Sequence, residues 1–195
     1  MIEFLYSIDV AIFFFINHTL SNPIFDWLMP FLTDLNKHKP VIVFVAGILI
    51  WLVWKGGSNG RATAGLLIVT IILSDQLSST LIKHLVERVR PCQALNGVRM
   101  LVDCGGGYSF PSSHAVNNFA GATIVAHFYS RQRWYWFTFA GVIAFSRPYV
   151  GVHYPSDILA GSIIGFFLAM VVLKIWDLVS KKFSKKTLQE IKLSN

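Results

Sequence analysis

Residues 158–175 read ILAGSIIGFFLAMVVLKI, an apolar run whose one charged residue, Lys174, stands near its end. A helix needs roughly 20 residues, each rising about 1.5 Å, to cross the hydrocarbon core of a bilayer. This run reaches that length with its flanks, and residues 62–82 and 112–130 form two further runs of comparable length. These three stretches therefore predict helices that span a membrane.

The composition of the whole chain supports this prediction. Hydrophobic residues make up 54% of its 195 residues, charged residues make up 14%, and the mean hydropathy is +0.55. A soluble domain carries about 25% charged residues, and a disordered chain is far less apolar. The two cysteines exclude a disulfide-dense scaffold and a multi-cysteine zinc or iron–sulfur site. What remains is a small integral membrane protein.

Charges and turn residues bound six apolar segments, which cover residues 4–20, 40–54, 62–82, 112–130, 134–146 and 158–175. The predicted fold is all-α: a six-transmembrane-helix bundle that forms one domain over residues 1–195. The second and fifth segments are short, so they extend into their flanks or cross a locally thinned bilayer. The first segment carries Asp9, which weakens its prediction as a span. Residues 22–35 are semi-apolar and are expected along the membrane interface.

Basic and aromatic residues orient the predicted bundle. Most Lys and Arg residues fall at the face that holds both chain ends, and so do five of the six Trp residues: Trp51, Trp54, Trp134, Trp136 and Trp176. Cytoplasmic loops collect Lys and Arg, and Trp gathers at membrane interfaces. We therefore expect an inner (plasma) membrane protein with both termini in the cytoplasm, including a basic tail over residues 181–195. The net charge of +7 is scattered over both faces, which argues against nucleic acid as a partner.

Three polar clusters interrupt the apolar pattern. They are KHLVERVRP at residues 83–91, FPSSH at residues 110–114 and SRPYVGVHYPSD at residues 146–157. Because successive spans alternate in direction, all three clusters fall on the same face, opposite the predicted cytoplasmic face. The alternation therefore predicts one interfacial site built from segments that are distant in the chain.

The residue types in these clusters suit the binding of a phosphate. Lys83, Arg90 and Arg147 match its charge, and the two guanidinium groups match its oxygens as planar forks. Residues 111–113 predict a helix entry with Ser112 or Ser113 as N-cap, where free backbone N–H groups and the helix dipole favour an anion.

Two histidines in the clusters suit the chemistry of phosphoryl transfer. His153 followed by Asp157 predicts a base whose tautomer a carboxylate fixes, and attack by that base would split hydrolysis into two steps. His114 can donate a proton to the leaving group and then activate water. No dense carboxylate cluster is present to hold a metal pair, so we expect metal-independent hydrolysis without a cofactor.

The three motifs Lys83-x6-Arg90-Pro91, Pro111-Ser112-Ser113-His114 and Ser146-Arg147-x5-His153-x3-Asp157 resemble the signatures of the type 2 phosphatidic acid phosphatase superfamily. The resemblance covers roughly residues 60–180. It implies a six-helix membrane domain, with His153 as nucleophile, Asp157 as its orienting partner and His114 as general acid. The phosphate ligands that it implies are Lys83, Arg90, Ser112, Ser113 and Arg147. Ser113 departs from the glycine usual in the family, and its side chain takes space near the phosphate.

The resemblance implies a lipid phosphate in the bilayer as the substrate. Candidates are undecaprenyl diphosphate, phosphatidylglycerophosphate, phosphatidic acid and lipid A phosphate, and the size of the chain is most similar to undecaprenyl-diphosphatases and phosphatidylglycerophosphatases. Two alternatives stay open: a phosphotransferase in which a lipid acceptor takes the phosphate, and an anion transporter whose cations line a path. The oligomeric state is left undetermined.

Several residues near the motifs have two interpretations. Asp75, inside a span, supports the floor of the site or makes a hydrogen bond between helices. Asn117 and Asn118 orient His114 or join helices. Cys92 and Cys104 lie in one outer loop, where they form a disulfide or stay free thiols. Gly105–Gly107 acts as a lid hinge or a simple turn, and the Gly161-x3-Gly165 pattern predicts close helix packing within the fold.

Overall fold

The computed structural model describes the backbone of residues 2–193 and the side-chain surroundings of residues 3–182. Over these residues the chain is helical with no strand, so the all-α prediction is confirmed. The main helices are α1 (Ile2–Phe14), α2 (Pro23–Thr33), α3 (Lys39–Lys55), α4 (Gly57–Asp75), α5 (Lys83–Val86), α6 (Pro91–Ala94), α7 (Ser113–Phe128), α8 (Arg133–Tyr149) and α9 (Pro155–Leu193). Short π or 3-10 segments join them: η1 (Phe15–Thr19), η2 (Leu35–Lys37), η3 (Gln76–Ile82) and η4 (Ser130–Gln132).

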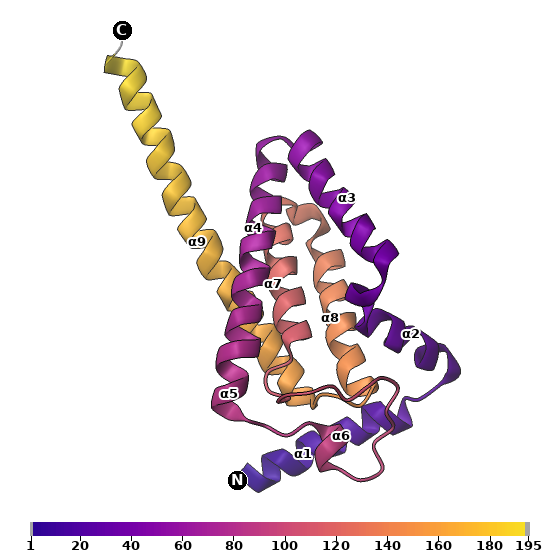
Figure 1. Ribbon diagram of the computed structural model, residues 1–195. Coiled ribbons are helices and arrows are strands. Elements are labelled where there is room, and N and C mark those ends of the chain that lie inside the picture. The colour runs from indigo at the N-terminus through magenta and orange to yellow at the C-terminus, as the bar shows by residue number, and fades with distance from the viewer. Residues whose placement is uncertain (1, 194–195) are drawn as a thin grey trace.

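Helix α7 lies at the centre of the bundle, between α4, α8 and α9 (Figure 1). Two residues of α7 that are fully buried, Ala115 and Ala120, have small side chains. They therefore let the neighbouring helices approach closely. Ala120 and Ile124 pack against Ala169 and Leu173 of α9 in one apolar cluster. This close packing fixes the N-terminus of α7 beside the start of α9, where two of the three polar clusters lie.

Gly161 and Gly165 make the contact between α7 and α9 possible. A Cβ atom at Gly161 would lie 2.8 Å from the carbonyl oxygen of Ser112, and one at Gly165 would meet the carbonyl oxygen of Val116. Both obstacles are backbone atoms, which cannot turn away as a side chain can. The predicted role of the Gly161-x3-Gly165 pattern in packing within the fold is therefore confirmed.

We expect Gly165→Ala to destabilise the protein by about 3 kcal/mol, because the added methyl group overpacks the α7–α9 contact. Thermal unfolding in detergent measures the loss. Gly47→Ala in α3 is the matched control, since a Cβ atom there meets nothing within 4 Å. Equal melting temperatures for the two variants would contradict the packing argument.

Two helical stretches of the described residues are long and apolar enough to cross a membrane: Gly57–Ala94 and Pro155–Lys182. A third would be the pair Glu3–Thr19 and Pro23–Thr33, if these two helices, bent by 116°, form one broken span. Helices α3, α7 and α8 contain 17, 16 and 17 residues, slightly fewer than the roughly 20 residues that a span needs. The count of six spans therefore stays a prediction.

The two described ends of the chain lie at opposite ends of the bundle (Figure 1). Helix α1 lies at the end that holds α5 and α6, called the site end below, whereas α9 leads away from it. This arrangement differs from the prediction that both termini share the face opposite the site. The physical reason is the bend after η1, which turns the chain into α2 instead of across the bundle. The predicted basic tail, residues 181–195, is helical to residue 193, and its side chains beyond residue 182 lie outside the described residues.

Candidate active site

Backbone hydrogen bonds tie the three polar clusters together at the site end. The amide of Ser112, at the N-cap of α7, donates to the carbonyl of Asp157 over 3.1 Å. The amide of Ser109 donates to the carbonyl of Arg88 over 2.7 Å. Segments far apart in the chain therefore meet as one layer under α7 and α9.

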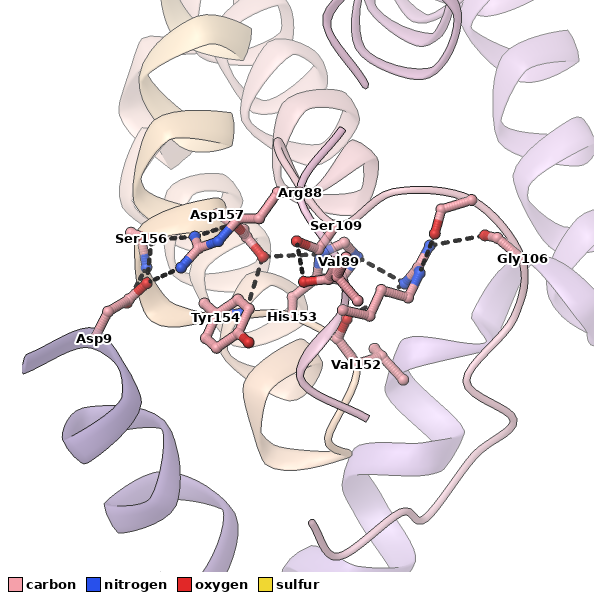
Figure 2. Close-up of polar contacts among 12 residues, drawn as sticks. Asp9, Arg88, Val89, Gly106, Ser109, Val152, His153, Tyr154, Ser156 and Asp157 are labelled. Atoms are coloured by element: carbon pink, nitrogen blue, oxygen red, sulfur yellow. Dashed lines mark hydrogen bonds and ion pairs between the residues drawn. The ribbon is translucent and has the colours of Figure 1, made fainter. Parts of the chain in front are cut away.

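His153 and Asp157 form a buried pair at the start of α9 (Figure 2). Pro155 begins the helix, a position that its fixed φ and missing N–H suit. This start places Asp157 in the first turn, where its Oδ2 lies 3.4 Å from Nδ1 of His153 and accepts a hydrogen bond of 2.9 Å from the amide of Tyr154. The carboxylate therefore faces one nitrogen of the imidazole ring.

Arg90 approaches the other nitrogen of the ring. Its Nη1 lies 3.4 Å from Nε2 of His153. A guanidinium group can only donate, so Nε2 accepts and carries no proton. In the neutral ring the proton is then on Nδ1, which faces Asp157. The free electron pair of His153 therefore points toward a cation.

Backbone carbonyls hold Arg90 in this position. Its guanidinium donates to the carbonyls of Gly107, Gly106 and Val152 over 3.2 to 3.3 Å. A disulfide between Cys92 and Cys104 closes the segment just before the two glycines. Of the two interpretations of these cysteines, the structure has the disulfide.

Arg147, buried near the end of α8, donates from Nη1 to the hydroxyl of Thr33 over 2.6 Å. Its Nε, the Oγ of Ser112 and the Nδ1 of His153 are buried, and among the described residues none has a hydrogen-bond partner within normal geometry. Buried polar atoms in native proteins are usually paired, and an unpaired one calls for an explanation such as a catalytic role or a bound ion or water. Nδ1 of His153 faces Asp157, whereas the Nε of Arg147 and the Oγ of Ser112 are free to bind a polar ligand.

Burial lowers the pKa of the His153 imidazole to about 3, and the positive charges of Arg147 and Arg90 act in the same direction. The carboxylate of Asp157, 3.4 Å from Nδ1, opposes this shift without cancelling it. His153 is therefore neutral at physiological pH.

This low pKa predicts how stability depends on pH. Between pH 6.5 and about 3 the unfolded chain binds a proton at residue 153 that the folded protein does not bind, so stability falls as the pH falls through this window. Each pH unit inside the window costs up to about 1.4 kcal/mol, or about 3–5 °C in Tm. We expect the Tm of His153→Gln to fall less than that of the wild type between pH 6.5 and 4.5. Parallel pH profiles for the two proteins would contradict the neutral histidine.

Lys83 and His114 approach the same site from two other helices. Arg90 and Arg147 lie within electrostatic range of Lys83. His114, in the first turn of α7, lines a cavity together with Thr33, which holds Arg147. The structure thus brings together all the predicted catalytic and phosphate-binding residues, whose roles remain predictions.

Of the residues with two interpretations, Asp75 is linked to the site, whereas Asn117 joins two helices. Ser113 lies 3.0 Å, Oγ to Oγ, from Ser79, and Ser79 donates to the carboxylate of Asp75 over 3.1 Å. The hydroxyl group of Ser79 therefore links Asp75 to Ser113 of the site. The Oδ1 of Asn117 accepts from Ser74 of α4 and joins two helices. Asn118 donates to the backbone carbonyl of His114 and not to its ring.

The model of the PAP2 superfamily matches residues 64–180. The chain belongs to the PAP2 superfamily. It is 34% identical to a lipid A 4'-phosphatase of Bacteroides thetaiotaomicron, over 86% of this chain and 76% of that protein. It is also 34% identical to phosphatidylglycerophosphatase B of Bacillus subtilis, over 63% of this chain and 62% of that protein.

A solved structure agrees with this assignment. The crystal structure of Aquifex aeolicus LpxE matches with a TM-score of 0.69 and 25% sequence identity, over 85% of this chain and 94% of that one. This PAP2 protein is therefore a membrane-bound hydrolase, a lipid phosphatase. Within the described residues, no group of three or more His, Cys, Asp or Glu side chains lies close enough to hold a metal ion. Metal independence itself stays a prediction, for which activity in EDTA is the test.

Sequence reasoning missed three residues that contact the site of this PAP2 protein. Thr33 binds Arg147, and its position in α2 gave no signal of that contact. Arg88 lies two residues before Arg90, at one of the unspecified positions of the motif Lys83-x6-Arg90-Pro91. Asp9 was noted only as a charge that weakens a predicted span, although a carboxylate in an apolar helix is itself a signal of function.

Proposed function

We propose that this PAP2 protein removes a phosphate from the headgroup of a lipid through a phosphohistidine at His153. The observation that carries the proposal is the orientation of the imidazole ring, with Nδ1 toward Asp157 and the lone pair of Nε2 toward Arg90. A phosphate that enters between Nε2 and the cations would meet a nucleophile already in its reactive tautomer. The buried Nε of Arg147 and Oγ of Ser112 would then find phosphate oxygens as partners.

The reaction proceeds in two balanced steps. The Nε2 of His153 forms a bond to phosphorus while the bond from phosphorus to the lipid oxygen breaks, and His114 gives that oxygen its proton. Water then attacks the phosphorus and loses a proton to His114, and the bond from phosphorus to nitrogen breaks. Free phosphate leaves, and both histidines return to their starting states. Asp157 stabilises the positive charge that the ring of His153 carries between the steps.

The surroundings of His114 suit a leaving group attached to a lipid. It lines a cavity of ≈ 450 Å³ between α2, α3, α7 and α8, whose other walls include Val41, Val45, Phe139 and Ile143. Most of its lining is apolar, and Ser113 and His114 are among its polar lining residues, so the first carbons of a lipid fit beside the general acid.

The arrangement of the chain suggests how the protein sits in the membrane. The exposed side chains of Trp51, Trp54 and Trp134 belong to the helix ends opposite the site, as expected for one interface. We place that end at the cytoplasm, together with the end of α9. The site and α1 then lie at the outer leaflet, where substrates such as lipid A phosphate, phosphatidylglycerophosphate and undecaprenyl diphosphate carry their headgroups. Two of the lipid phosphatases to which the chain is similar are named for the first two of these lipids.

A panel of lipid phosphates, incubated with purified protein in EDTA, tests this function. We expect release of free phosphate from at least one lipid, and inhibition by vanadate, which imitates pentacoordinate phosphorus. Transfer of the phosphate to an added lipid alcohol, with no free phosphate, would instead support the phosphotransferase. If no lipid phosphate is consumed, the proposed function fails.

A further inference from the structure

We propose that Asp9 and Arg88 act as a pair of positioning residues for the reaction: Arg88 fixes the carboxylate of Asp157 against His153, and Asp9 compensates the charge that Arg88 brings. The proposal rests on the proposed function, because it concerns how the carboxylate supports the nucleophile. It assigns a catalytic purpose to α1, which lies outside the matched PAP2 region at residues 64–180.

Arg88 contacts both carboxylates at once (Figure 2). Its Nη1 donates to Oδ1 of Asp157 over 2.6 Å and to the hydroxyl of Ser156 over 2.7 Å. Its Nη2 donates to Oδ2 of Asp9 over 2.6 Å. The guanidinium carbon lies 3.9 Å from the centre of the Tyr154 ring. The planar guanidinium group thus contacts the Tyr154 ring with its face and one carboxylate with each of its two Nη nitrogens.

The two oxygens of Asp157 have separate partners. Oδ1 binds Arg88, whereas Oδ2 faces Nδ1 of His153 and accepts from the amide of Tyr154. A carboxylate held only at Oδ2 could rotate about its side chain. The contact at Oδ1 fixes the rotation, so Arg88 determines the direction in which Asp157 presents its charge to the imidazole.

Asp9 is the one carboxylate of α1 that lies buried. Its Oδ1 accepts from the amide of Ser156 over 2.9 Å, and its Oδ2 accepts from the Ser156 hydroxyl and from Arg88. The first turn of a helix favours a carboxylate. Through its hydrogen bonds with Ser156, the residue before Asp157, Asp9 joins α1 to the start of α9. Every contact of this carboxylate therefore lies next to the catalytic pair.

The charges explain why both residues are needed. A lone guanidinium on Asp157 would reduce the negative potential that stabilises the charged ring of phosphorylated His153. A second carboxylate at 2.6 Å on the other side of Arg88 restores the balance, because the group of three then carries one net negative charge. Arg88 can therefore orient Asp157 without cancelling its effect on His153.

The test compares three variants with the wild type: Asp9→Asn, Arg88→Gln and the double variant. Asn keeps an acceptor for the Ser156 amide, and it removes the charge together with the second oxygen, which accepts from Arg88 and from the Ser156 hydroxyl. We expect kcat to fall about tenfold for Asp9→Asn and about 100-fold for Arg88→Gln, the range in which partners of functional ligands act, with KM within about twofold of the wild type. The rate constant of the phosphoenzyme burst at saturating substrate should fall by the same factors, and it does not depend on the fraction of folded enzyme.

The double variant separates positioning from simple docking of α1. Without Arg88, the carboxylates of Asp9 and Asp157 repel each other, so removal of the Asp9 charge should leave kcat unchanged or raise it. Docking of α1 alone predicts that Asp9→Asn costs the same factor in both backgrounds. Equal costs in the two backgrounds, or a change in KM alone, would overturn the proposal.

Two further variants complete the experiment. Glu3→Gln removes an exposed carboxylate from the same helix and should keep full activity. His153→Ala shows which statement has failed: if it retains phosphate release, the proposed function is wrong. If it is inactive while Asp9→Asn and Arg88→Gln behave as Glu3→Gln does, only the positioning pair is wrong.

Discussion

His153→Ala is expected to release phosphate from a lipid phosphate at least about 10³-fold more slowly than the wild type, because removal of a covalent nucleophile leaves only binding and electrostatic effects. The variant should also fail to form a phosphoenzyme. With a ³²P-labelled lipid phosphate, the wild type should yield a labelled protein that survives alkali and loses its label in acid, as phosphohistidine does. Rapid quench in alkali followed by gel autoradiography measures this species.

His84→Ala is the matched control for that experiment. His84 lies next to Lys83 in α5, is exposed, and places its Nδ1 2.8 Å from the carbonyl of Thr80 in the preceding segment η3. Its removal should leave turnover within about twofold of the wild type, as expected for a surface position. Phosphate release by His153→Ala at the wild-type rate would overturn the assignment of the nucleophile, whatever the effect of His84→Ala.

The alternation of apolar segments was enough to predict which clusters meet. Residues 83–91, 110–114 and 146–157 end up in one layer because each follows or precedes a helix of the bundle, and helix direction alternates independently of packing detail. The internal spacing of the third motif predicted the pair of His153 and Asp157 for a similar reason, since four residues across a helix start leave two side chains adjacent.

Contacts between distant segments could not be predicted in this way. Arg88 meets Asp9 across 79 positions of sequence, and Arg147 meets Thr33 across 114 positions. Such pairs depend on where α1 and α2 dock, and apolar periodicity describes only which face of a helix is buried. The predicted span at residues 4–20 shows the same limit, because its apolar character fits a helix that crosses the bundle and one that lies at its end.

His114→Ala should separate the two halves of the reaction. With a lipid phosphate, whose alkoxide leaving group needs a proton, we expect turnover to fall about 10³-fold. With p-nitrophenyl phosphate, whose leaving group is stable as an anion, the first step should stay within about tenfold of the wild type. The second step still needs a base to activate water, so the phosphoenzyme should accumulate. A burst of p-nitrophenol followed by slow turnover is the expected record.

The control for this variant is His127→Ala, which removes an exposed histidine from the last turn of the same helix. With p-nitrophenyl phosphate it should give the same time course as the wild type, and with the lipid substrate it should show no loss of turnover. A general acid acts on the leaving group, whereas a residue that only binds phosphate acts on every substrate alike. Equal losses in the rate of the first step for lipid phosphate and p-nitrophenyl phosphate in His114→Ala would therefore make His114 a phosphate ligand. The proton of the leaving group would then have to come from a group other than His114.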